Sequence, residues 1–152
     1  MTLPKIGDPC PEVSFRTADR ETVSLADLKG KENLVIAFYV MAFTGGWERE
    51  LKEFENNYEE FQKLDTQDWA VSIDLATRQK AFADHCGLSF KAVSGFPNHD
   101  GAKTLGAFND ERGLTKRITY VVDKEGILRH IIDDPGDMER HARESLEVVK
   151  GL

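Results

Sequence analysis

The sequence predicts a single α/β domain in which a mixed central sheet is covered by helices on both faces. Residues 33–40 are continuously apolar and rich in β-branched and aromatic side chains, the pattern of a strand buried on both faces. An apolar stripe at helical spacing follows, and a second apolar segment at 69–73 comes after it. This alternation implies parallel strands, whereas the apolar segments on either side of the turn at 123–126 predict an antiparallel hairpin.

Size and charge limit the functions that the chain can have. It has 152 residues, 40% of them hydrophobic, which suits one cored domain spanning residues 1–152. The net charge of −7 argues against a nucleic-acid partner, because phosphate backbones need basic patches. The longest apolar run, 34–43, is shorter than the roughly 20 residues that a membrane helix takes. With no apolar leader at the N-terminus, we expect a cytoplasmic protein without membrane contact.

The N-terminal part begins with an extended segment. Pro9 and Pro11 favour it, because proline fixes φ and removes a backbone donor. Apolar and polar side chains alternate around residues 13–15, which predicts a short strand. Ser24 is a good N-cap, and it opens a helical turn that ends at Gly30.

The helix after the central strand has a single apolar face. Its members recur at spacings of three or four residues and are Trp47, Leu51, Phe54, Tyr58, Phe61 and Leu64. We expect a second helix over 77–86, with Thr77 as its cap and Gly87 as its stop. The remaining elements expected are a strand at 91–94, a helix at 100–108, the hairpin within 117–133 and a closing helix at 138–152 that has His141 near its apolar face. This order resembles a thioredoxin-like three-layer sandwich.

Four segments together resemble one family over residues 6–135. They are IGDPCPEVSF, VSLADLKGKENLVIAFYVMAFT, VSIDLATRQKAFADHCGLSF and GLTKRITYVVDKEGILRHIIDDP. The chain is similar here to the alkyl hydroperoxide reductase and thiol-specific antioxidant family, the peroxiredoxins. That family has Pro-x-x-x-Thr-x-x-Cys after the central strand, a Glu three residues further on, and an Arg on a distant strand. The resemblance therefore implies a thiol peroxidase fold and an antioxidant function.

Carried over to this sequence, the family site is only partly present. The resemblance assigns the Thr to Thr44, the Glu to Glu50 and the Arg to Arg117. Met41 stands at the position of the family Pro, and Trp47 stands at the position of the peroxidatic Cys. The residue that performs the family's chemistry is therefore replaced.

This replacement removes the nucleophile. Peroxide reduction requires a thiolate, formed when a helix N-terminus and a nearby Arg lower the pKa of a Cys. An indole has one N–H donor and does not ionise near neutral pH. Trp47 can pack in the core, which is compatible with a cation–π contact to Arg117, or it can stack on a ligand. Glu50 and Arg117 can equally form an ion pair between helix and strand, and Thr44 can simply cap the helix.

The two cysteines are candidate alternative thiols. Cys86 ends the second helix, where the partial negative charge of the helix terminus disfavours a thiolate. Cys10 lies between two prolines and is interpreted as a small buried side chain. The chain has no Cys-x-x-Cys and no zinc-type spacing, so we expect neither a cofactor nor a metal.

Two functions therefore remain open. The first is a peroxiredoxin-like protein without peroxidase activity, which acts as a binding or regulatory module for an unknown protein or small molecule. The second is a thiol-dependent peroxidase whose nucleophile has moved to Cys86 or Cys10. The resemblance also implies a homodimer, since the family often pairs through loops around the site, where Phe43 and Trp47 would lie.

Overall fold

The computed structural model describes residues 3–40 and 47–152, with the side chains of 47–50 and 138 left out. Its centre is a seven-stranded sheet in the order β2-β1-β5-β4-β3-β8-β9. The strands are β1 (Ser14–Arg16), β2 (Thr22–Ser24), β3 (Asn33–Phe38), β4 (Thr66–Ser72), β5 (Lys91–Ser94), β8 (Ile118–Val122) and β9 (Leu128–Asp133). Strands β3, β4 and β5 are parallel, and β8 pairs antiparallel with both β3 and β9. The sheet is therefore mixed, as the sequence predicts.

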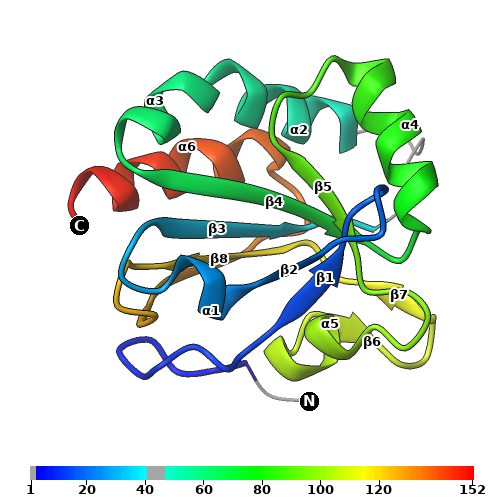
Figure 1. Cartoon of the computed structure of the whole chain (residues 1–152), viewed down its shortest axis with the longest axis horizontal. Helices are drawn as coiled ribbons and strands as arrows, with labels where there is room; N and C mark the ends of the chain where they lie inside the picture. The colour runs from blue at the N-terminus through cyan, green and yellow to red at the C-terminus, as the bar shows by residue number, and fades with distance from the viewer. Residues whose placement is uncertain (1–2, 41–46) are drawn as a thin grey trace.

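Helices cover both faces of this sheet (Figure 1). One face carries α2 (Trp47–Asn56), α3 (Tyr58–Lys63), α4 (Ala76–Cys86) and α6 (Met138–Lys150), whereas the short α1 (Leu25–Leu28) and α5 (Asp100–Leu105) lie on the other. Each face has its own hydrophobic core, because every side chain of β3 is buried and successive residues point to opposite faces. The expected α/β three-layer sandwich is confirmed.

The core on the side of α1 and α5 is built around aromatic rings. Phe15 contacts Phe38 and Trp69 edge-on, with each pair of ring centroids 6.1 Å apart. Phe38 meets Tyr120 in the same way at 5.7 Å. Edge-to-face pairs are favourable because the positive edge of one ring meets the negative face of the next. This cluster links β1, β3, β4 and β8 beneath the sheet.

Several expected elements are confirmed with small shifts. The strand at 91–94 matches β5, and the hairpin at 117–133 matches β8 and β9. Ser24 caps α1 in a capping box with Asp27, as expected from its residue type. Gly87 ends α4 in the left-handed conformation, at φ 69°.

Other expectations are wrong at their boundaries. The helix expected over 47–64 is two helices, because at Asn57 the side-chain amide donates to the Glu53 carbonyl at 2.8 Å and the backbone leaves helical geometry. Leu75, not Thr77, is the N-cap of α4. The helix expected over 100–108 ends at Leu105, since Gly106 is left-handed and the next residues form β6 (Phe108–Asn109) with β7 (Leu114–Thr115). The sequence patterns also missed β2.

Gly101 generates a stability prediction. A Cβ added there would lie 2.5 and 2.6 Å from two ring atoms of Phe15. Alanine gains up to about 1 kcal/mol of helix propensity over glycine, but overpacking a core costs about 1–3 kcal/mol. We therefore expect Gly101→Ala to lower the free energy of unfolding in urea. Gly151→Ala is the control, since its nearest neighbouring atom is at 3.5 Å. An unchanged or raised stability of Gly101→Ala contradicts this packing argument.

Candidate active site at the carboxyl edge of the parallel strands

The candidate site lies at the edge where β3, β4 and β5 end. Strand β8 runs antiparallel to β3, so it begins at this same edge, and its register pairs Thr119 with Ala37. Arg117 directly precedes β8 and therefore lies beside Tyr39, the residue that follows β3. Ligand sites of open α/β sheets form at such carboxyl ends.

The structure describes the predicted site residues to different extents. Arg117 is described, and Trp47 is the first residue of α2. Thr44 and Met41 lie outside the described residues, as do the side chains of Trp47 and Glu50. The expected Glu50–Arg117 ion pair and the expected positions of the Thr44 hydroxyl and the Trp47 ring therefore stay predictions.

One sequence assignment needs correction. Counting back four residues from Thr44, as Pro-x-x-x-Thr requires, gives Val40 and not Met41. Val40 is half-buried, and its carbonyl accepts a hydrogen bond from the Thr115 hydroxyl at 3.3 Å. The position still holds no proline, so the departure from the family pattern remains.

Arg117 is held by the main chain at the start of α6. Its side chain is buried, and Nη1 donates to the Pro135 carbonyl at 2.6 Å. A hydrogen bond from a charged donor is stronger than a neutral one, which restricts the guanidinium to one arrangement. The turn at 134–137 therefore fixes where the positive charge of Arg117 lies.

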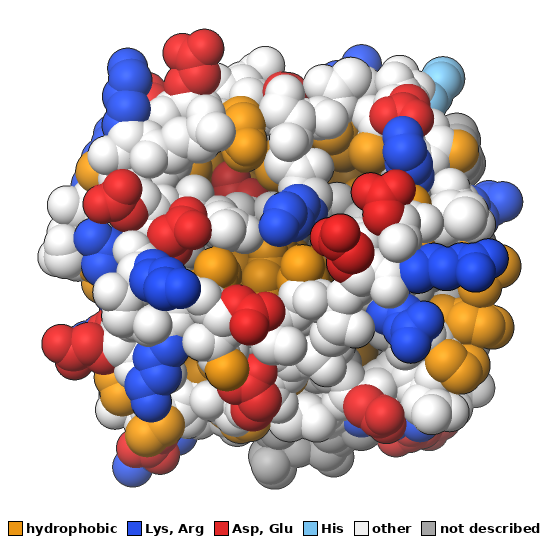
Figure 2. Space-filling view, viewed as in Figure 1, with side chains coloured by type: hydrophobic (Ala, Val, Ile, Leu, Met, Phe, Trp, Pro, Cys, Tyr) orange, Lys and Arg blue, Asp and Glu red, His pale blue; other side chains and the backbone are white. Residues whose placement is uncertain are grey.

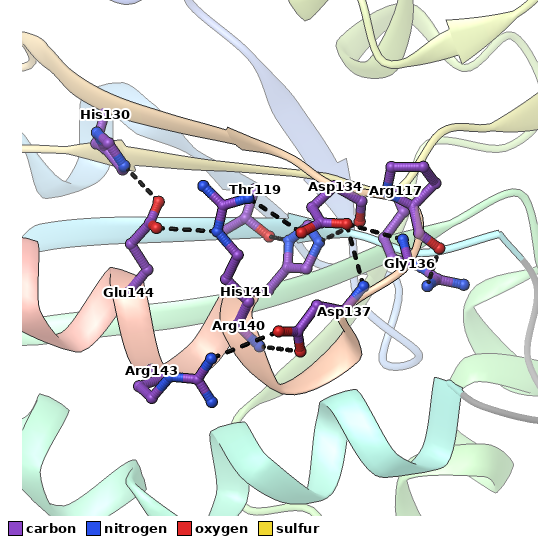
Figure 3. A network of polar contacts seen from close by, with 11 residues as sticks. Arg117, Thr119, His130, Asp134, Gly136, Asp137, Arg140, His141, Arg143 and Glu144 are labelled. Carbon is purple, nitrogen blue, oxygen red and sulfur yellow. Dashed lines mark hydrogen bonds and ion pairs between the residues drawn. The ribbon is translucent and has the colours of Figure 1, made fainter.

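The buried imidazole of His141 anchors this turn (Figure 3). Its Nε2 lies 2.7 Å from the Asp134 carbonyl, and its Nδ1 lies 2.8 Å from the Thr119 hydroxyl. A carbonyl only accepts, so Nε2 carries the proton and Nδ1 accepts from Thr119. The pKa of His141 is lowered, first by burial and also by the positive charge of Arg117. The ring is therefore neutral. It joins α6 to β8 through the Thr119 hydroxyl and to the turn at 134–137 through the Asp134 carbonyl.

Ion pairs on the solvent side complete the network in Figure 3. The Asp134 carboxylate accepts from the backbone of Gly136 and Asp137 and from Arg140, and these bonds hold its pKa at about 2. Arg140 also contacts Glu144 at 3.0 Å, and Glu144 contacts His130 at 2.6 Å. These contacts connect the turn, α6 and β9, so the position of Arg117 is tied to the docking of α6.

A second set of buried polar groups lines the same edge. The Thr115 hydroxyl donates to the Tyr39 carbonyl, and the Tyr39 hydroxyl donates to Gln79 at 3.2 Å. Gln79 donates in turn to the Ser72 carbonyl at 3.5 Å, while the Ser72 hydroxyl binds Asp74 at 2.6 Å. The sequence reasoning missed these residues and His141. A signal was available only for Ser72 and Asp74, which are polar residues at the end of an apolar strand and just after it.

Cys10 lies away from this edge. It donates its backbone N–H to the Gly126 carbonyl at the far end of the β8–β9 hairpin, about 15 Å along the strand from Arg117. Cys86 is the last residue of α4 and packs, half-buried, against the core on the α2 side of the sheet. The two thiols belong to different cores on opposite faces of the sheet and form no disulfide. Burial raises the pKa of Cys10 to about 11.

Within 3–40 and 47–152, no group of three His, Cys, Asp or Glu side chains is placed to hold a metal. In the same residues, no helix is long and apolar enough to cross a membrane.

The mixed sheet with helices on both faces is that of a thioredoxin-like protein, and comparison with known proteins assigns the family. The model of the AhpC/TSA family matches residues 6–131, so the chain belongs to this family. It is 30% identical over 135 residues to alkyl hydroperoxide reductase E of Mycobacterium tuberculosis, covering 88% of each protein. It is 33% identical over 143 residues to chloroplastic peroxiredoxin Q of Triticum aestivum, covering 93% of this chain and 65% of that protein.

Solved structures share the fold. The crystal structure of peroxidoxin BcpB from Mycobacterium tuberculosis superposes with a TM-score of 0.90 at 23% identity and covers 99% of both chains. AhpC of the same organism superposes with a TM-score of 0.83 at 22% identity, covering 99% of this chain and 98% of that one. The fold is therefore that of the peroxiredoxins.

His141 generates a pH prediction. Because its pKa is lowered in the folded chain, the unfolded chain takes up a proton first as the pH falls below about 6.5. The free energy of unfolding therefore falls with pH below that value, and it stops falling at the lower folded pKa. We expect His141→Gln to show a smaller loss of stability between about pH 7.5 and about pH 5.5 than the native chain.

The comparison variant for this measurement is His99→Gln. The pKa of His99 is also lowered, mainly by its partial burial, so His99 makes a contribution of the same sign. Denaturant unfolding at each pH gives both contributions. An identical pH dependence in the native chain and in His141→Gln would rule out a neutral buried His141 as the source.

Proposed function

We propose that this AhpC/TSA family protein has lost its peroxidatic cysteine and acts as a binding or regulatory module, not as a peroxidase. The observation that carries the proposal is that residue 47, the position that the family resemblance assigns to the peroxidatic cysteine, is a tryptophan, whereas Arg117 is present. A thiolate must contact the peroxide oxygen that such a cationic group stabilises. Cys10 lies at the far end of the β8–β9 hairpin from Arg117, away from the edge where that contact would be made.

The chemistry of the available groups supports the same proposal. A thiol with a pKa of about 11 is almost fully protonated at neutral pH, which argues against Cys10 as a nucleophile. Cys86 is half-buried at a helix C-terminus, where the helix dipole disfavours negative charge. An indole at position 47 forms no sulfenic acid. A peroxidase with a relocated nucleophile is therefore the less supported alternative.

The way in which Arg117 is held supports a module that binds a ligand. A buried guanidinium held by a main-chain carbonyl is a preorganised donor for an oxygen-bearing ligand. The expected ligand is a protein or a small molecule that presents an oxygen acceptor to this guanidinium.

Restoring the cysteine tests the proposal. We expect the native chain to consume hydrogen peroxide in the presence of dithiothreitol no faster than free cysteine does. We expect Trp47→Cys to turn over, because a thiolate at the start of α2 regains the helix N-terminus and Arg117. Adding Arg117→Gln to Trp47→Cys should then lower the rate at least about 10²-fold, as removal of one oxyanion donor does.

Cys10→Ser and Cys86→Ser variants of the native chain are the controls. If the native chain consumes peroxide well above the rate of a free thiol, and one of these variants abolishes that activity, the proposal is wrong and the relocated nucleophile is right.

We also propose that the chain forms a homodimer through the carboxyl edge of the sheet. A cavity of about 510 Å³ lies there, at the start of α4 and the end of β5. Leu75 and Phe96 line it and are 52% and 48% exposed, and Arg16 and Arg20 stand beside them. Apolar side chains with an arginine rim are typical of protein interfaces. The expected contacts of Phe43 and Trp47 lie outside the described side chains.

Charge placed on this cavity should break the dimer. We expect sedimentation at about 50 μM to give a dimer for the native chain and a monomer for the Leu75→Asp, Phe96→Asp double variant, because burying two carboxylates is costly. Ile6→Asp is the matched control, since Ile6 is 50% exposed outside this cavity. A native monomer at that concentration would remove the proposal.

A further inference from the structure

Asp68 is a buried acid in strand β4 that has no hydrogen-bond partner. It is 4% exposed, and neither carboxylate oxygen contacts a donor among the residues that the structure describes. Burial, and then the negative charge of Glu55, raise its pKa well above the ordinary value. A buried polar group without a partner costs free energy, so its presence in a packed strand needs a physical reason.

The side chain of Asp68 points toward α3. Trp69 and Val71 belong to the core beneath the sheet, whereas Ala70 belongs to the core on the α3 side. Since successive residues of a strand alternate between faces, Asp68 lies on the side of Ala70. A recess of about 280 Å³ opens on that side. Its lining includes Asp68, Tyr58, Gln62 and Phe90.

This recess is acidic and has aromatic walls. Tyr58 and Phe90 lie with ring centroids 6.4 Å apart. The pKa of Tyr58 is raised by its partial burial and then by Asp68, Glu55 and Glu32, so three carboxylates act on one phenol. Figure 2 shows the same side of the molecule as Figure 1, where acidic side chains are interspersed with basic and hydrophobic ones. Carboxylates combined with aromatic rings attract cations.

The basic residue at the recess does not neutralise Asp68 directly. Lys91 also lines it, but its register with Trp69 places the Lys91 side chain on the opposite face of the sheet from Asp68. The charges that raise the pKa values of Asp68 and Tyr58 are all negative. The recess therefore has an excess of negative charge and a buried acceptor.

We propose that this recess binds a small organic cation, an alkylguanidinium or alkylammonium, with the Asp68 carboxylate as its hydrogen-bond acceptor. The occupant is not a divalent metal, because the described residues place no three metal-ligating side chains together. The carboxylate oxygens are covered, so the cation enters by displacing a side chain of the rim. Gln62 is exposed there, and its amide donates to the Tyr58 hydroxyl at 3.2 Å.

This site is independent of the proposed function. Asp68 pairs with Val35 in the first half of β4, whereas Arg117 lies where β3 ends. A result at one site therefore leaves the other unaffected.

Nuclear magnetic resonance on the native chain tests the proposal with two isosteric probes. N-ethylguanidinium carries the charge and the donors, and N-ethylurea has the same shape without the charge. We expect ethylguanidinium to lower the pKa of Asp68, followed through its Cγ shift, and to move the Gln62 side-chain amide signals in a saturable way. Ethylurea should do neither. Equal responses to both probes, or no response to ethylguanidinium, would overturn the proposal.

Two variants locate the binding. Asp68→Asn keeps the shape of the side chain but removes the charge, and we expect it to weaken ethylguanidinium binding at least about tenfold. Glu59→Gln removes an exposed carboxylate of α3 outside the recess and should bind as the native chain does. Undiminished binding by Asp68→Asn shows that the cation binds elsewhere. If that variant does not fold, the comparison of the two probes on the native chain decides the question.

Discussion

The pairing of β3 on both of its sides is the constraint on which the rest of this structure depends. Its parallel ladder to β4 and its antiparallel ladder to β8 leave no free edge, and its six residues are all buried. A strand buried on both faces needs a helical layer above and below it. The same pairing decides where the site lies, because β8 must begin beside the end of β3 and so delivers Arg117 to that edge.

Much of the fold could be predicted because it rests on local patterns. The hydrophobic run of β3 and the turn between β8 and β9 each have a signal within a few residues. The break between α2 and α3 had no such signal in the sequence, because the apolar stripe continues across it. Asn57 breaks the helix through a side-chain bond to Glu53, and this competition between side chain and backbone is invisible to hydrophobic periodicity. Asp68 shows the same limit, since a charged residue in a fully paired strand runs against the pattern.

In the candidate site, too, some residues could be assigned from the sequence and others only from the folded structure. Arg117 was assigned to the site from the family pattern around it, and that assignment stays a prediction, although the structure places the residue at the carboxyl edge. His141 could not be found in that way. Its role depends on the Asp134 carbonyl and the Thr119 hydroxyl, which are brought to it from the β8–β9 hairpin. A backbone carbonyl carries no residue-type signal, so only the folded arrangement shows that the helix, the turn and the arginine form one unit.

The contact between Arg117 and the carbonyl of residue 135 has a consequence for the history of such a protein. Every residue type supplies a carbonyl, so substitution at that position leaves the acceptor in place. An arginine held by a carboxylate would instead lose its partner with a single codon change. An arginine anchored on the main chain therefore keeps its position when the side chains around it are substituted. The geometry of the Arg117 contact is in this way less sensitive to mutation than an ion pair between two side chains would be.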